Sequence, residues 1–441
     1  MGIAVFAVNL FSFGLSGLGF NIMEEMTIQE LQEKMNSGEL TARSLAESYL
    51  ERIERLNRQG PAINAVIELN PDALEIADRL DRERAAGQKR GPLHGIPILI
   101  KDNIDTHDQM QTTSGSLALE GSIAPRDAHI VKLLRAGGAL ILGKTNLSEW
   151  ANFRGRHSVS GWSSRGGLTR NPYALDRTAC GSSSGSGAAV AANFCAAAVG
   201  TETDGSIICP SQTNGIVGVK PTLGLVSRSG IIPISHSQDT AGPMARTVAD
   251  AAILLGALAG TDERDPATRF GEKRGLKDYS PFLDKDGLKG ARIGVARKMA
   301  GTNVRVLKIF DSCIEVMKQL GALIVDPAEV PNFNKFGKTE MEVLHYEFKA
   351  DLNKYLASLG PKAPARTMAD VIRFNEENKA SVMPYFGQEH MTVADKKGPL
   401  SSEKYREALA KNHRLARREG IDVAIRENRL DALIVPTGVD D

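Results

Sequence analysis

The stretch that decides the fold is CGSSSGSGAAVAANFCAAAVGTETDGSIICPS, residues 180–211. A Gly/Ser-rich loop opens it and leads into a small-residue helix at 188–192. An apolar strand at 196–199 follows, and a sharp glycine-bracketed turn then ends on Ser206. From 91 to 255, short apolar runs alternate with helical stretches and Gly/Ser-rich turns, which predicts an α/β sheet with helices packed on its faces.

The Gly/Ser loop allows three interpretations. The start of a helix gathers backbone N–H groups without partners, which suits an anion or an oxyanion. A flexible turn is the ordinary alternative. A phosphate-binding loop is the weakest, because no Gly-Lys-Ser/Thr follows the glycines and no acidic residue stands where a dinucleotide fingerprint needs one.

The turn GTETDGS at 200–206 is a candidate nucleophile turn. Nucleophilic serines often sit on such turns, where the hydroxyl is exposed beside free backbone N–H groups. A single serine is far more often a cap or turn residue. Here two Gly/Ser turns flank one helix–strand unit, so Ser182 and Ser206 can meet.

A serine nucleophile needs a base. The eight histidines are scattered, and none lies in a motif with an acidic orienter. Lysine can replace histidine where loss of solvent keeps the amine neutral. Lys101 ends the apolar run at 96–100, so the strand would carry its amine into a dry interior. The alternative is a solvated lysine at a strand end.

The rest of the chain reads as one large domain over 27–441, with 262–400 as a variable, helix-rich region. Two helices are expected between 27 and 56, with Thr27 and Glu30 spaced as a capping box requires. Further expected elements are a strand at 291–297, a helix at 308–320 and a buried strand at 430–437.

The composition limits the classes of partner that this protein is expected to bind. Hydrophobic content of 42% and charged content of 24% are typical of a globular protein. Lys+Arg 54 against Asp+Glu 53 leaves a net charge of +1, which gives no electrostatic case for nucleic acid or a membrane surface. The four cysteines have no zinc spacing, so no metal is expected; we expect buried free thiols in a reducing compartment.

The first residues are apolar and uncharged, MGIAVFAVNLFSFGLSGLGF at 1–20. They lack the basic region of an export signal, and no clear cleavage site follows. Residues 1–26 are therefore either a signal or an extension upstream of Met23 or Met26. A cytoplasmic location is expected, with export as the alternative.

Three segments together resemble the amidase-signature hydrolases. GIPILIKDNID resembles the lysine motif of that family, CGSSSGSGAAVAAN its Gly/Ser signature, and GTETDGSI-x-CP its nucleophile turn. The order of the motifs and the separation of the two serines also match. The resemblance implies an α/β fold with a mixed central sheet covered by helices on both faces. Family chains continue for several tens of residues beyond the strand at 430–437, so the sheet would lack C-terminal strands if Asp441 is the true end.

The resemblance also implies roles. Ser206 would be the nucleophile, Lys101 the base, and Ser182 the serine that bridges them, tied to a cis peptide bond at 181–182 or 182–183. No metal or organic cofactor would be needed. The oxyanion hole would be formed by the backbone N–H groups of Thr203, Asp204, Gly205 and Ser206.

Within the family, the chain resembles the bacterial peptide amidases, which remove the C-terminal amide from peptides. Asp204 stands where many relatives carry glycine, and CGSSSGSG replaces the commoner GGSSGGS. Asn152 and Phe153 lie where relatives line the substrate cleft, although Trp150 and Phe153 could equally be core residues. The expected partner is a small-molecule or peptide amide, bound by a monomer or homodimer.

Three alternatives stay open. One is the A-type subunit of a glutamyl-tRNA amidotransferase, which would need partner subunits. Another is a general aliphatic or aryl amidase. The third is an inactive or binding-only truncated homologue, since missing core strands would expose apolar sheet edges.

Overall fold

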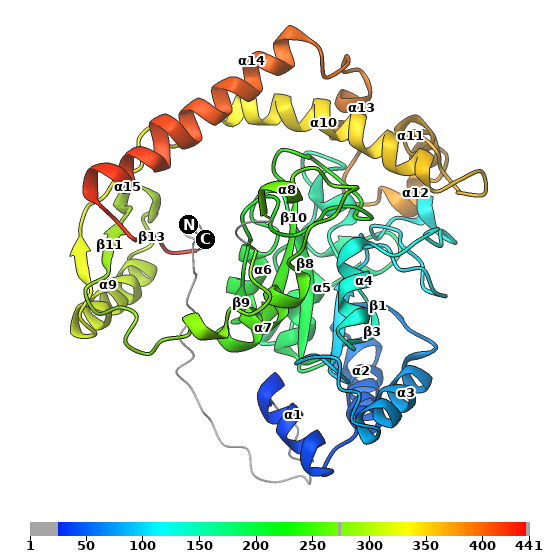
Figure 1. The fold of residues 1–441 in the computed structure, drawn as a ribbon. Coiled ribbons are helices and arrows are strands. Elements are labelled where there is room, and N and C mark those ends of the chain that lie inside the picture. Colours follow the sequence, from blue (N-terminus) through cyan, green and yellow to red (C-terminus); the bar gives the residue numbers. More distant parts are fainter. Residues whose placement is uncertain (1–24, 272–274, 438–441) are drawn as a thin grey trace. The chain divides into compact units, whose positions relative to one another are not determined.

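The computed structural model describes residues 25–271 and 275–437 (Figure 1). The extension or signal expected at residues 1–26 lies outside the described residues as far as residue 24. The chain divides into two compact units. The core unit contains residues 25–280 and 352–392, and the second unit contains residues 281–351 and 393–437. That residues 27–441 form one domain stays a prediction.

The core unit is built on a six-stranded sheet with the order β1-β3-β2-β8-β10-β9. β2 runs parallel to both β3 and β8, whereas β1, β9 and β10 pair antiparallel to their neighbours. The sheet is therefore mixed, as expected. Its strands are β1 (Val66–Leu69), β2 (Pro97–Lys101), β3 (Leu140–Thr145), β8 (Ala197–Glu202), β9 (Val217–Gly218) and β10 (Thr240–Ala245).

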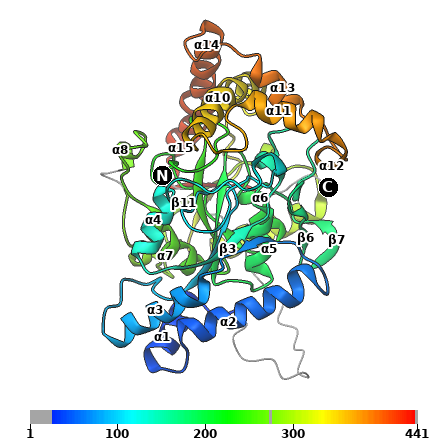
Figure 2. The same cartoon turned by 90° about the vertical axis from the view of Figure 1, so that its right-hand side faces the viewer.

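The middle of this sheet is buried throughout. Every residue of β2, β3, β8 and β10 is buried. Continuous apolar runs such as PILI in β2 and AAV in β8 are what strands covered on both faces require. Figure 2 shows α5 (Ser184–Ala191) and α6 (Ile208–Thr213) on one side of the sheet. α4 (His129–Ala136) and α7 (Val248–Leu258) lie on the other side.

The predicted pair of N-terminal helices is confirmed as α1 (Ile28–Ser37) and α2 (Ala42–Ile53). Thr27 and Glu30 form the predicted capping box. The other helices assigned wholly or partly to the core unit are α3 (Ala73–Ala85), α8 (Thr268–Gly271), α10 (Gly337–Ser358), α11 (Met368–Glu377), α12 (Lys379–Val382) and α13 (Glu389–Asp395). Two short hairpins complete it, β4 (Trp162–Ser163) with β5 (Gly167–Leu168) and β6 (Arg170–Asn171) with β7 (Ala174–Thr178).

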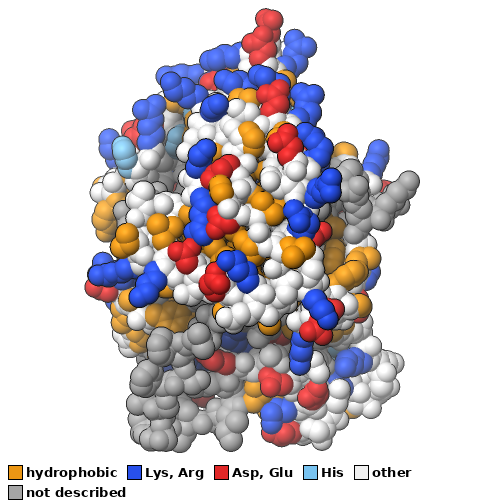
Figure 3. Space-filling view, turned by 90° about the vertical axis from the view of Figure 1, so that its left-hand side faces the viewer, with side chains coloured by type: hydrophobic (Ala, Val, Ile, Leu, Met, Phe, Trp, Pro, Cys, Tyr) orange, Lys and Arg blue, Asp and Glu red, His pale blue; other side chains and the backbone are white. Residues whose placement is uncertain are grey.

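The second unit holds a three-stranded parallel sheet with the order β12-β11-β13. Its elements are β11 (Arg292–Val295), α9 (Val304–Gln319), β12 (Leu323–Val325), α14 (Glu403–Asn412), α15 (Asp422–Asn428) and β13 (Ala432–Ile434), together with most of α10. β11, α9 and β13 match the strand, helix and strand predicted in this region. The last strand was expected to be buried, however, and that expectation was wrong, because every residue of β13 is partly exposed. Figure 3 shows hydrophobic side chains among the charged ones on one face of the molecule.

A helix that crosses a membrane needs about 20 mostly apolar residues. Among the described residues, no helix combines that length with that apolarity.

Candidate active site

Lys101 is the last residue of β2 and is completely buried. Its Nζ donates to Oγ of Ser182 at 2.8 Å, to Oγ1 of Thr201 at 2.9 Å and to the carbonyl oxygen of Thr201 at 3.2 Å. Burial lowers the pKa of Lys101 to about 7, against the opposing effects of Glu202 and Asp239. An amine with this pKa is largely neutral slightly above pH 7, as a lysine base requires.

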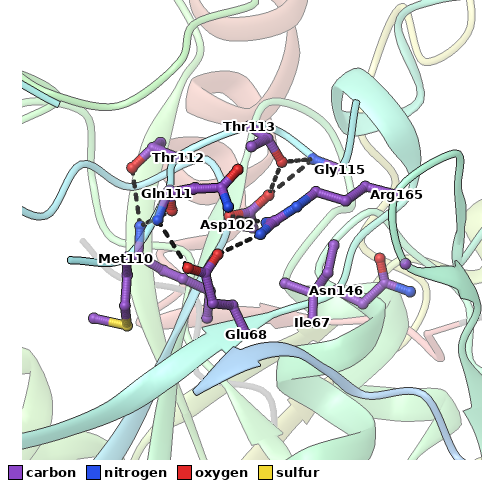
Figure 4. Close-up of polar contacts among 12 residues, drawn as sticks. Ile67, Glu68, Asp102, Met110, Gln111, Thr112, Thr113, Gly115, Asn146 and Arg165 are labelled. Carbon is purple, nitrogen blue, oxygen red and sulfur yellow. Dashed lines mark hydrogen bonds and ion pairs between the residues drawn. The ribbon is translucent and has the colours of Figure 1, made fainter. Parts of the chain in front are cut away.

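Asp102, the first residue after β2, contacts a different set of groups. The carboxylate of Asp102 accepts hydrogen bonds from the hydroxyl of Thr113 and the N–H of Gly115, and it lies 3.6 Å from Arg165 (Figure 4). Arg165 also pairs with Glu68. This network fixes the end of β2.

Ser182 lies in the loop just before α5, and it is completely buried. The peptide bond between Gly181 and Ser182 is cis, the first of the two predicted positions. The N–H of Ser183 donates to the carbonyl oxygen of Ser206 at 3.1 Å. The loop that carries Ser182 and the turn that carries Ser206 are therefore adjacent, as the helix–strand unit predicted.

The turn of residues 203–206 connects β8 to α6. Within the part of the chain that the structure describes, none of the four backbone N–H groups of this turn donates a hydrogen bond. Gly205 has a φ of 79°, a left-handed conformation that favours glycine. The turn thus leaves four donors available beside Ser206, a residue that is 8% exposed.

The cysteines differ from the expectation of free thiols. Cys180 and Cys209 form a disulfide with a Cα–Cα distance of 6.0 Å, and both are partly exposed. Cys195 is a buried free thiol, and Cys313 is free and partly exposed. The expectation was wrong for the first pair because α5 and β8 bring the two ends of the motif together. The signal in the sequence was that a cysteine borders each serine turn.

Of the two predicted cleft residues, Asn152 lies close to Gly181, the residue before Ser182. A Cβ added to Gly181 would lie 3.5 Å from Nδ2 of Asn152, and this residue is half-buried. Phe153 is 7% exposed and stacks on His390, with 4.7 Å between the ring centroids. Trp150 is 1% exposed. Trp150 and Phe153 are thus both buried, and Asn152 lies beside the cis peptide bond. That Asn152 and Phe153 line the substrate cleft stays a prediction.

The structure adds a buried ion pair that sequence reasoning missed. Arg154 and Glu149 pair with both side chains fully buried. The guanidinium of Arg154 also donates to the carbonyl oxygens of Val382, at 2.7 Å, and Phe386, at 3.1 Å, and it lies 4.0 Å from the centre of the Phe386 ring. It therefore ties the loop that holds Asn152 to residues 382–386. No pattern in the sequence links segments so far apart.

Thr201 and Asn103 were missed as well. Thr201 accepts both from Lys101 and, through Oγ1 at 3.0 Å, from the amide of Asn103. Both residues lie inside the quoted motifs, one residue after Gly200 and two after Lys101. Motif matching named the candidate reacting groups but not the polar groups that contact them.

Comparison with known proteins agrees with this geometry. The family profile described as Amidase matches residues 44–441. The chain belongs to the amidase family. It is therefore an enzyme that hydrolyses amides.

Three known proteins show which members of the family this amidase is similar to. The native peptide amidase from Stenotrophomonas maltophilia is 50% identical, with a TM-score of 0.91 over 94% of this chain and 84% of that one. A probable amidase of Arabidopsis thaliana is 44% identical over 93% of this chain and 80% of its own length. The A-type subunit of the glutamyl-tRNA(Gln) amidotransferase of Thermosynechococcus vestitus is 39% identical over 74% of this chain and 66% of its own length.

Proposed function

We propose that this amidase removes the C-terminal amide of peptides through Ser206, Ser182 and Lys101. The observation that carries the proposal is the 2.8 Å hydrogen bond from the fully buried amine of Lys101 to Ser182, whose loop borders the Ser206 turn. The substrate class is supported by the 50% identity to the peptide amidase from Stenotrophomonas maltophilia.

In the proposed reaction, neutral Lys101 takes a proton from Ser182 while Ser182 takes one from Ser206. The Ser206 oxygen attacks the amide carbonyl, and a tetrahedral intermediate forms. The free N–H groups of residues 203–206 stabilise its oxyanion, and each such donor can contribute about 3 kcal/mol in the transition state. Lys101 returns the proton through Ser182 to the nitrogen, and ammonia leaves. Water then attacks the acyl-enzyme by the same proton route.

The first test compares wild type with Ser206→Ala on peptide amides, with ammonia release as the measurement. The rate should fall on the order of 10⁴-fold or more. A fluorophosphonate probe should label wild type but not this variant. Ser312→Ala, an exposed serine of α9, is the matched control and should keep both activities. Turnover near wild type in Ser206→Ala would refute the nucleophile assignment.

A second candidate function follows from the match to the A-type amidotransferase chain. Such a protein would release ammonia from free glutamine and pass it to a partner. A substrate panel separates the two functions, because ammonia from peptide amides supports our proposal and ammonia from glutamine alone supports the alternative. Simple aliphatic and aryl amides in the same panel test for a general amidase.

A further inference from the structure

Glu202 is the last residue of β8, and it is 5% exposed. Its Oε2 accepts hydrogen bonds from the N–H groups of Ile207 at 2.6 Å and Ile208 at 3.0 Å. Residues 203–206 lie between this carboxylate and its two donors in the chain. The Glu202 side chain therefore links the residue that precedes the turn to the two residues that follow it.

The first residue of the turn is held as well. The hydroxyl of Thr203 donates to Oδ1 of Asp239 at 2.5 Å. Nζ of Lys220 donates to the carbonyl oxygen of Thr203 at 2.6 Å and lies 3.6 Å from Oε1 of Glu202. The turn is thus fixed at both ends by charged side chains, while its own four N–H groups donate no hydrogen bond within the described residues.

We propose that Glu202 is a positioning residue for amide hydrolysis, which holds the N–H groups of residues 203–206 towards the substrate and keeps a negative charge near Lys101. This inference rests on the proposed function. Within the described residues, Glu202 forms no hydrogen bond with Ser182 or Ser206. Its effect on the reaction would therefore come from the position of the turn and from its charge near Lys101.

The charge matters because Lys101 has few charged neighbours. Glu202 and Asp239 are the groups that favour its ammonium form, while burial opposes that form. Asp102 faces Arg165. A nearby anion stabilises a cation, so the loss of the Glu202 charge should make Lys101 easier to deprotonate.

A purely structural role is the competing explanation. A carboxylate that accepts N–H groups at the start of a helix is a common cap, and α6 begins at Ile208. A cap that acted on stability alone would leave the plateau rate of labelling unchanged in a folded Glu202→Gln variant. The two explanations therefore differ in the plateau rate of Ser206 labelling, which is read together with its pH dependence.

The experiment uses the full chain and measures the rate of fluorophosphonate labelling of Ser206 between pH 5 and 9, together with ammonia release from a peptide amide. Glu202→Gln keeps the shape and removes the charge, whereas Glu202→Asp keeps the charge on a shorter arm. Asp262→Asn is the matched control, since Asp262 is a buried carboxylate that accepts from Ser227 at 2.7 Å and does not act on Lys101. Melting temperatures show whether each variant is folded.

We expect the half-point of the acidic limb to fall by about 0.5–1 pH unit in Glu202→Gln and to stay in place in Glu202→Asp. The plateau rate should fall about 10-fold in both, because the turn is held less firmly. An unshifted half-point in folded Glu202→Gln overturns the proposal, as does an equal shift in Asp262→Asn. Absence of labelling and turnover in wild type would instead refute the proposed function.

Discussion

The two sheets of this amidase differ in how completely they are covered. All residues of β2, β3, β8 and β10 in the core unit are buried. In the second unit, β12 and β13 contain no buried residue. The hydrophobic cluster around α9 has only three buried members, Val295, Phe310 and Ile314.

The difference in burial determines where in the chain a lysine can stay neutral near pH 7. A lysine stays neutral near pH 7 only where water is excluded from every side, and the middle of the covered sheet provides that. The half-exposed sheet of the second unit could not lower a lysine pKa in the same way. Segments with few buried apolar contacts also open most readily, so we expect the second unit to exchange its amide hydrogens first.

Among the substitutions that compare the two sheets, the largest effect is expected for Lys101→Met, which removes the proposed base while filling the same buried space. Ammonia release from a peptide amide should fall about 10²–10⁴-fold. In wild type the rate should also fall as the pH drops through about 7, because Lys101 then becomes protonated. A wild-type rate that is constant from pH 8 to pH 5 would contradict the assignment of Lys101 as base.

The same variant has a signature in stability. The pKa of Lys101 is lowered from 10.5 to about 7 on folding, so between these values the unfolded chain binds more protons than the folded one. The free energy of unfolding of wild type should therefore rise with pH in this window, by at most about 1.4 kcal/mol per unit from this group. Denaturant titrations of Lys101→Met should lack this contribution.

A matched pair of glycines tests the two sheets directly. A Cβ at Gly200 in β8 would lie 2.7 Å from Sδ of Met244 and 2.9 Å from Oγ of Ser183. Ser183 follows Ser182 in the chain, so Gly200→Ala should lower the labelling rate of Ser206 about 10–100-fold. It should also cost about 1–3 kcal/mol through overpacking.

Gly294→Ala makes the corresponding change in β11, where the new Cβ would lie 2.3 Å from Cδ1 of Leu430 and 2.9 Å from Cβ of Ala328. A similar cost of about 1–3 kcal/mol is expected, seen by hydrogen exchange in the second unit. The labelling rate of Ser206 should stay within twofold of wild type. An equal loss of labelling in both variants would show that the half-exposed sheet also determines the geometry at Ser206.

The buried strands of the core unit were a part of the fold that the sequence could predict. Continuous apolar runs revealed β2 and β8, and the glycine-bracketed turn pointed to Ser206. The functional role of Lys101 came from the family resemblance, because a lysine at a strand end is usually solvated. The contact of Arg154 with Val382 joins segments far apart in the chain, so no local pattern could reveal it. The closure of the turn by Glu202 is local in sequence, but the motif match did not single out this carboxylate.

Reduction of the disulfide should lower the labelling rate of Ser206 less than Gly200→Ala does. Cys180 and Cys209 border the two serine turns, so a reductant such as dithiothreitol should lower the labelling rate several-fold and expose two additional thiols. Loss of the cross-link should lower the free energy of unfolding by about 3 kcal/mol. The double variant Cys180→Ser, Cys209→Ser should reproduce both effects without reductant, whereas Cys313→Ser should change neither. A reduced protein with unchanged labelling would show that the sheet alone holds the turns together.

The smallest effect is expected at two exposed positions of α9, in the second unit. Val304 is 77% exposed and Ile309 is 67% exposed. Val304→Lys or Ile309→Lys should change the free energy of unfolding by less than about 0.5 kcal/mol, because an exposed apolar side chain buries little surface. Ammonia release should stay unchanged in both variants. If either substitution instead lowers the free energy of unfolding by more than about 1 kcal/mol, other groups cover these side chains in solution. The second unit would then be more completely covered than the exposed fractions of its residues indicate.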